Sequence, residues 1–125
     1  MLKFRKYFDI KWLVLAFLST TVVIILTHIP QESMPSQIQQ SGLDKILHAL
    51  AYGTITFCVI LSIKSPPSIY IALIVLCSLL TIGIFDEITQ PIVHRQASLS
   101  DLLADVIGVI SVLFVYLVSK KIIEK

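Results

Sequence analysis

The sequence predicts an all-α polytopic membrane protein, a bundle of four transmembrane helices. Hydrophobic residues make up 56% of the 125 residues, and the mean hydropathy is +0.90, which is above the apolar share of ordinary soluble domains. A soluble domain this small buries only a modest fraction of its surface, so most of these side chains must face lipid. They lie in long runs without the alternation typical of strands.

We expect one domain, residues 1–125, with helices at about 12–29, 43–63, 68–88 and 99–118. The first run would span roughly 27 Å, about one hydrocarbon thickness. A basic start followed by an apolar run also describes a signal peptide. This run is long for one, and it ends in Leu-Thr-His-Ile-Pro rather than in small residues. We therefore interpret it as a retained membrane helix.

Local signals predict where the helices begin. The segment 30–42 is rich in Gln and Ser and contains two prolines, which favours a loop. Ser41-x-x-Asp44 and Ser98-x-x-Asp101 match the capping box, in which two side chains satisfy the exposed N–H groups of a helix start. These two motifs are predicted to open the second and fourth helices.

The basic residues predict the orientation, because cytoplasmic flanks of membrane helices are enriched in Lys and Arg. An even number of crossings puts both termini and the 64–67 connection on one side, with eight of the ten basic residues. Lys45 and Arg95 are on the other side, with six of the eight acidic residues. We expect a multi-pass protein of the cell membrane with both termini in the cytoplasm.

The segment 85–108, FDEITQPIVHRQASLSDLLADVIG, carries four of the eight acidic residues together with His94 and Arg95. Ionisable residues at membrane helices are costly and often mark a functional site. Residues three or four apart share a helix face, and the candidates follow this spacing within three helices. They are Asp44, His48 and Tyr52; Glu87 and Gln90; Asp101 and Asp105; and Arg95 in the loop between the last two helices.

Structural roles also account for part of this pattern. The two capping-box aspartates need do no more than cap their helices. Arg95 could face lipid phosphate or neutralise Glu87. His48, Glu87 and Asp105 are harder to explain. His48 and Asp105 each lie about one turn inside their helices, where a charged group needs a partner or a proton. A purely structural network and a functional pocket both meet that need, and we favour the pocket.

Small residues indicate which helices meet. Ala49-x-x-x-Gly53 and Ala104-x-x-x-Gly108 both match the small-x-x-x-small pattern that lets membrane helices approach closely. The second and fourth helices are therefore predicted to pack against each other. This contact would bring the candidates on those two helices together.

These residues resemble the VanZ-like family of small bacterial membrane proteins. The resemblance lies in DKILHALAY at 44–52, DEITQ at 86–90, Arg95, and SLSD at 98–101 continuing to Gly108. Matched positions are Asp44, Lys45, His48, Tyr52, Glu87, Gln90, Arg95, Asp101 and Gly108. Asp105 departs from the family, which often has Asn there, so no role is carried over to it. The resemblance implies a four-helix protein of the bacterial cell envelope with a link to glycopeptide (teicoplanin) resistance, but no agreed reaction.

We expect an outward-facing polar site that binds or modifies the headgroup of a lipid, a lipid-linked molecule or a glycopeptide. His48 would exchange a proton near neutral pH, with a carboxylate from Glu87, Asp101 or Asp105 to orient it. Arg95 would hold a phosphate or carboxylate. The expected catalytic residues are His48, Glu87 and Asp101, and the expected substrate-binding residues are Asp44, Tyr52, Gln90, Arg95 and Asp105.

Other functions stay open, because no nucleophile constellation is visible and an enzyme is not established. The polar residues could instead brace a non-enzymatic scaffold. A divalent-metal site is a third possibility, but the ligand spacing is not diagnostic, so no residue is assigned to a metal or cofactor. Cys58 and Cys77 lie in apolar runs, without the spacing of a zinc site or disulfide framework. Membrane lipids are the expected partners, and nucleic acid is not.

Overall fold

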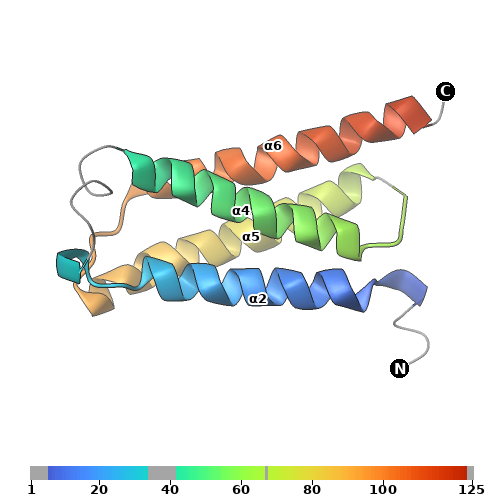
Figure 1. Cartoon of the computed structure of the whole chain (residues 1–125). Helices are drawn as coiled ribbons and strands as arrows, with labels where there is room; N and C mark the ends of the chain where they lie inside the picture. The colour runs from blue at the N-terminus through green and yellow to red at the C-terminus, as the bar shows by residue number, and fades with distance from the viewer. Residues whose placement is uncertain (1–5, 34–41, 67, 124–125) are drawn as a thin grey trace.

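The computed structural model describes residues 6–33, 42–66 and 68–123. Four long helices lie in these segments: α2 (Ile10–Thr27), α4 (Leu43–Ser62), α5 (Ile69–Thr89) and α6 (Leu99–Ile123). Two short 3₁₀ helices, η1 (Gln31–Ser33) and η2 (Gln90–Val93), lie at their connections. Each long helix is long and apolar enough to cross a membrane, which confirms the predicted all-α four-helix architecture (Figure 1).

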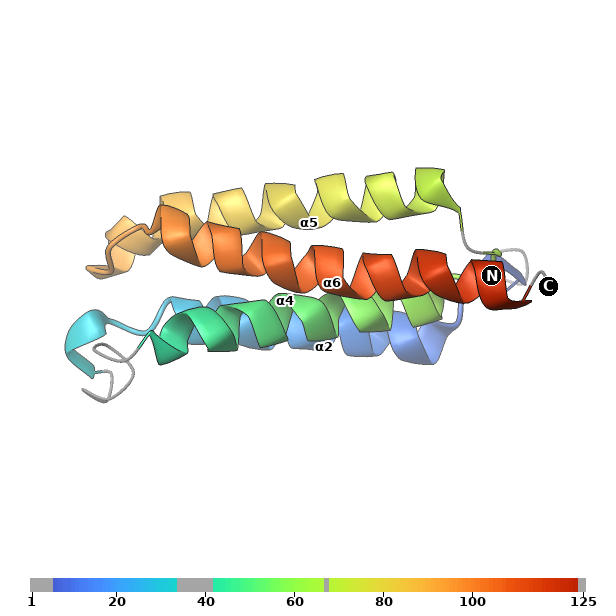
Figure 2. The same ribbon diagram turned by 90° about the horizontal axis from the view of Figure 1, so that it is seen from above.

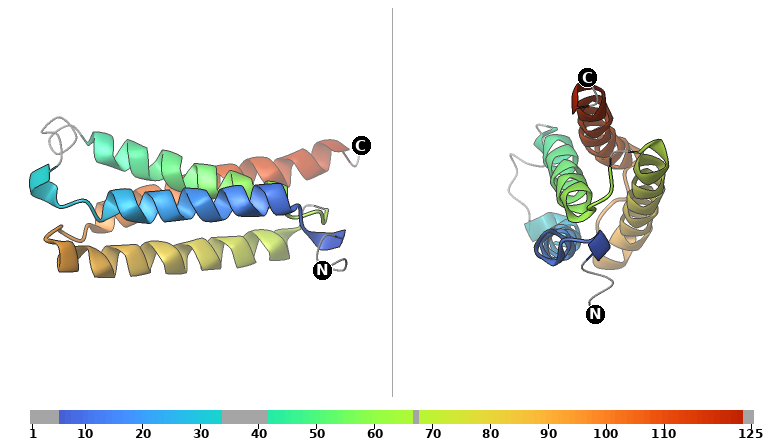
Figure 3. Two further views of the ribbon diagram at one scale, coloured as in Figure 1. Left: turned by 60° about the horizontal axis from the view of Figure 1, so that its bottom comes forward. Right: turned by 90° about the vertical axis from the view of Figure 1, so that its right-hand side faces the viewer.

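The helices form an elongated bundle with two unlike ends (Figures 1 and 2). One end carries η1, η2 and the first turns of α4 and α6, and we call it the polar end. The first turn of α2, the last turn of α6 and the neighbouring ends of α4 and α5 lie at the opposite end. In the end-on view of Figure 3, α4 lies between α2 and α6, and α5 lies on the opposite side of the bundle from α4. The α4–α6 contact is the most extensive in the bundle, followed by α2–α4 and then α5–α6.

Helix boundaries differ from the predictions by a few residues. The Asp9 side chain accepts a hydrogen bond from the Lys11 N–H at 3.0 Å, so α2 begins at Ile10 and ends at Thr27 instead of 29. Ser68 caps α5 in the same way, through the Tyr70 N–H. The last helix continues to Ile123 instead of stopping at 118. Neither Gly nor Pro follows residue 118 to break it, and lysine is a good helix former.

The two predicted capping boxes have different outcomes. Ser41 lies outside the described residues, and the N-cap of α4 is Gly42, whose φ of 66° is in the left-handed region that suits glycine. In α6 the box is half formed, since the Ser98 hydroxyl accepts from the Asp101 N–H at 3.3 Å. The Ser98 N–H donates to Glu87 Oε2 at 2.6 Å, not to Asp101. The Asp101 carboxylate therefore has another role than closing a capping box.

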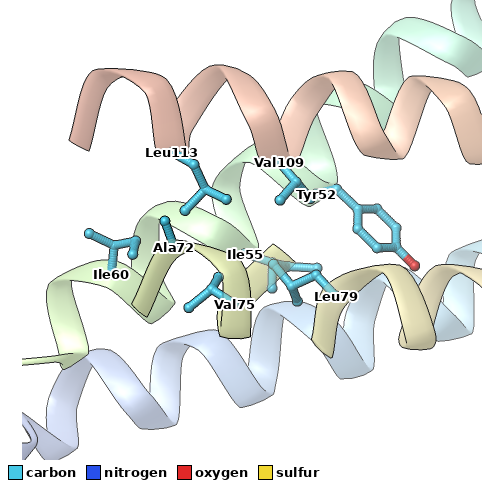
Figure 4. Close-up of a cluster of buried hydrophobic side chains, with 8 residues drawn as sticks. All are labelled: Tyr52, Ile55, Ile60, Ala72, Val75, Leu79, Val109 and Leu113. Carbon is cyan, nitrogen blue, oxygen red and sulfur yellow. The ribbon is translucent and has the colours of Figure 1, made fainter. Parts of the chain in front are cut away.

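The apolar core lies between α4, α5 and α6. Its buried side chains interdigitate along the bundle (Figure 4) and are Tyr52, Ile55, Ile60, Ala72, Val75, Leu79, Val109 and Leu113. Large apolar side chains elsewhere point outward, among them Phe17, Leu50 and Phe114, each more than 60% exposed. A lipid environment accommodates such a surface, whereas water would not.

Gly108 sets the distance between α4 and α6. A Cβ built on Gly108 would collide with the carbonyl oxygen of Ala49, whereas a Cβ built on Gly53 would lie 3.6 Å from the Gly108 carbonyl oxygen. The backbones of the two helices thus touch where the small-x-x-x-small pattern predicts. The same contact fixes the register that brings His48 on α4 opposite Asp105 on α6.

Candidate functional site

Buried polar side chains at the polar end connect all four long helices. Thr27, His48, Asp86, Glu87, Gln90, Asp101 and Asp105 are each no more than 6% exposed. Four of these seven carry carboxyl groups. Burying a carboxylate costs free energy unless it is paired or hydrogen-bonded, so the partners of each carboxylate show what the arrangement can do.

The central contact joins His48 to Asp105. His48 Nδ1 lies 2.9 Å from Asp105 Oδ1, and His48 Nε2 lies 4.0 Å from Asp101 Oδ2. Because an ionised carboxylate only accepts hydrogen bonds, we assign the proton of this short contact to Nδ1. The imidazole ring is thereby held with Nε2 facing Asp101.

Lys45 lies at the edge of this network. Its ammonium nitrogen is 3.4 Å from Asp101 Oδ1 and 3.5 Å from Asp44 Oδ2. The Lys45 side chain is 44% exposed, so solvent weakens both pairs and each contributes little stability. Asp44 also accepts from the Lys45 N–H at 2.9 Å. These contacts place Asp44 and Asp101 around one cation, beyond any capping role.

Glu87 connects the end of α5 to the start of α6. Its Oε2 accepts from the Ser98 N–H, and its Oε1 accepts from Gln90 Nε2 at 3.4 Å. Gln90 Nε2 also donates to Asp86 Oδ2 at 3.2 Å. The Gln90 amide therefore holds two neighbouring carboxylates and orders the last turn of α5.

Asp86 and the end of α2 form a part of the network that the sequence prediction missed. The Thr27 hydroxyl donates to Asp86 Oδ1 at 2.7 Å, and His28 Nδ1 lies 3.4 Å from the same oxygen. His28 Nε2 lies 3.0 Å from the Thr89 hydroxyl. A signal was available, because Thr27 and His28 are the polar residues closing the first apolar run, at the same membrane depth as the predicted candidates.

Arg95 contacts α2 and has no ion pair with Glu87 among the described residues. Its Nη1 donates to the carbonyl oxygens of Thr27 at 2.9 Å and Leu26 at 3.5 Å. These carbonyls belong to the last turn of α2, where the helix leaves acceptors unpaired and the dipole favours a cation. His94, with φ of 59°, turns the chain just before Arg95 and is exposed.

A cavity of about 450 Å³ opens between α2 and α4 at the polar end. Asp44, His48 and Arg95 supply ionisable groups to its wall. The rest of the wall is largely apolar and includes Val23, Leu26, Leu47, Leu50 and Ala51. All three leucines are exposed on the bundle surface, so the cavity is continuous with the surface that faces lipid.

The predicted site residues fall into two groups that meet at His48. Asp44, His48 and Arg95 line the cavity, while Glu87, Gln90, Asp101 and Asp105 belong to the buried network behind it. Tyr52 is packed in the core and does not line the cavity. Its hydroxyl and Asp105 Oδ2 both approach Gly83, at 3.5 Å and 3.4 Å from a Cβ built there.

Comparisons with protein-family models, curated proteins and solved structures found no match to this chain. Its function is therefore inferred from the geometry and chemistry of the polar end.

Proposed function

We propose that this membrane protein binds the polar headgroup of a lipid or lipid-linked molecule in the α2–α4 cavity. The observation that carries the proposal is the mixed lining of that cavity, in which Asp44, His48 and Arg95 occur together with exposed leucines. An amphiphile likewise combines a polar headgroup with an apolar chain. Its headgroup would contact Asp44, His48 and Arg95, and its hydrocarbon chain would lie against Leu47 and Leu50.

The charged groups favour a headgroup that carries a phosphate or carboxylate. Arg95 uses Nη1 for the α2 carbonyls, and no described residue accepts a hydrogen bond from its Nε or Nη2. A guanidinium can use such donors for an anionic group. Asp44 could accept from an ammonium or hydroxyl group of the same headgroup.

His48 gives the proposed site a proton donor or acceptor. Asp105 holds its Nδ1–H, and the other ring nitrogen, which faces Asp101 at 4.0 Å, is the one available to exchange a proton. The described partners of His48 are carboxylates, not a hydroxyl or thiol. The arrangement therefore supports headgroup binding with proton transfer better than covalent catalysis.

Replacing Arg95 with Gln should weaken binding of an anionic phospholipid by about 10-fold or more, since a hydrogen bond to a charged group contributes about 1.5–3 kcal/mol. Native mass spectrometry of the detergent-purified protein, titrated with phosphatidylglycerol, measures the change. Lys45→Gln is the matched control, because it removes one positive charge at the same end but outside the cavity lining. Equal losses in both variants would point to general charge attraction and contradict the proposal.

We also propose that the polar end faces the outside of a bacterial cell membrane and that both termini are cytoplasmic. The distribution of Lys and Arg and the resemblance to the VanZ-like family support this orientation. A reporter fused after residue 125 should be active only if it functions in the cytoplasm.

In this orientation the cavity would meet outer-leaflet lipids, lipid-linked precursors or glycopeptides. Expression should then change teicoplanin susceptibility, and Arg95→Gln should reduce that change.

A scaffold is the second candidate function, and the polar network favours it by linking residues of α2, α4, α5 and α6. In that case the polar side chains brace the bundle, and a protein partner docks on its surface. Affinity purification would recover a stoichiometric membrane protein, and Arg95→Gln would leave lipid binding unchanged. The scaffold would be favoured if variants that disrupt the polar network no longer recover the partner protein while lipid affinity does not depend on Arg95.

A further inference from the structure

Three buried side chains from three different helices present metal-ligating atoms to one another. His48 of α4, Glu87 of α5 and Asp105 of α6 each offer one such atom, and these atoms all lie within 4.8 Å of one another. The three residues are 5%, 6% and 2% exposed. Ligands about 2.0–2.2 Å from one ion lie roughly 3–4 Å apart, so small side-chain rotations would close the set around a cation.

Two buried carboxylate oxygens, one in the cluster and one beside it, have no hydrogen-bond donor among the described residues. Asp105 Oδ2 is buried and accepts no hydrogen bond from any described residue. Asp101 Oδ1 likewise accepts no hydrogen bond, and its nearest cation is the half-exposed Lys45 ammonium at 3.4 Å. A buried carboxylate oxygen without a donor is costly, and coordination to a cation is one way to satisfy it.

The balance of charge supports the same conclusion. Four carboxyl groups are buried at the polar end, those of Asp86, Glu87, Asp101 and Asp105. Arg95 donates to carbonyl oxygens, Lys45 pairs with Asp101 from the edge of the cluster, and His28 lies beside Asp86. None of these three basic groups lies at Glu87 or Asp105, where a divalent cation would offset the negative charge of the carboxylates.

We propose that His48, Glu87 and Asp105 bind one divalent first-row transition-metal ion, Zn²⁺ or Mn²⁺. One imidazole and two carboxylates suit these ions, whereas Ca²⁺ and Mg²⁺ prefer sites made of oxygen atoms alone. Three protein ligands are also the number found in metal sites that keep a position open. This site shares His48 with the headgroup cavity, but Glu87 and Asp105 do not line that cavity, and metal binding does not depend on the proposed lipid ligand.

Metal analysis of the purified full chain tests the proposal. The protein in detergent is stripped with chelator, equilibrated with ZnCl₂ or MnCl₂, desalted and measured by inductively coupled plasma mass spectrometry. The wild type should retain about one ion per chain and gain thermal stability with that ion. Glu87→Gln and Asp105→Asn keep the side-chain size and should each lower the metal affinity about 10-fold or more.

Asp44→Asn is the matched control, because it removes a carboxylate at the same end but outside the three-residue cluster, and it should bind metal as the wild type does. Size-exclusion chromatography and circular dichroism identify variants that do not fold. Substoichiometric metal in the folded wild type overturns the proposal, and so does unchanged affinity in Glu87→Gln and Asp105→Asn. Phosphatidylglycerol binding measured without metal separates the two proposals, since either can fail while the other holds.

Discussion

Replacing Gly108 with Ala is expected to destabilise the bundle by about 3 kcal/mol, at the upper end of the usual cost of overpacking. The added Cβ would collide with the Ala49 carbonyl oxygen and would lie only 3.0 Å from the Gly53 nitrogen. Both obstacles are backbone atoms of α4, so a change of rotamer cannot relieve them. The two helices must move apart, which also separates His48 from Asp105. Thermal unfolding of the detergent-purified variant measures the loss.

The matched control is Gly53→Ala, the same substitution on the opposite helix of the same contact. Its Cβ would meet its nearest neighbour, the Gly108 carbonyl oxygen, at an ordinary van der Waals distance of 3.6 Å. Alanine also favours helix over glycine by about 1 kcal/mol, so this variant should be as stable as the wild type or slightly more stable. Similar stability for the two variants would show that α4 and α6 do not approach as closely as described.

Replacing His48 with Leu is expected to cost about 3–5 kcal/mol of stability, the usual result of removing one partner of a buried pair. The Asp105 carboxylate would lose the partner of its Oδ1, and its Oδ2 already accepts no hydrogen bond from the described residues. Chemical or thermal unfolding in detergent again measures the change. An unchanged midpoint would mean that the two side chains are not paired.

A double replacement distinguishes the cost of leaving one charge without its partner from the cost of changing the volume that the pair fills. In His48→Leu combined with Asp105→Leu, no charge of this pair is left buried, so much of the lost stability should return. Such a variant would still lack the proposed metal ligands and proton carrier. If the double variant regains stability but does not bind metal, the His48–Asp105 pair serves function. If the double variant is as unstable as His48→Leu, the pair has a mainly structural role.

Much of the fold could be predicted from the sequence because lipid imposes simple requirements. Each membrane crossing needs a long apolar run that satisfies its own backbone hydrogen bonds, so four runs indicate four helices. The contact between α4 and α6 was also predictable, since glycine at 108 and small residues at 49 and 53 permit backbone contact. Helix ends were less certain, as Gly42 and Ile123 show, because caps and frayed turns depend on few interactions.

The candidate site could be predicted only in part. Helical spacing places Asp101 and Asp105 on one face of α6, and the Gly108 contact then directs that face towards His48. Spacing within one helix does not reveal how the end of α2 meets the end of α5, so the hydrogen bond from Thr27 to Asp86 was missed. Packing between the helices decides which of these side chains meet.

The sequence by itself determined that this chain forms four membrane-spanning helices and that six of its eight acidic residues lie towards one end, because hydropathy and charge are properties of single residues and short segments. Only the tertiary structure decided which carboxylates pair with which donors. In the folded chain the Ser98 N–H donates to Glu87, and Arg95 donates to the last carbonyl oxygens of α2. The lipid-facing cavity lies on one side of His48 and the buried cluster on the other. Such contacts depend on the register between helices, which is set by side-chain packing over the whole bundle.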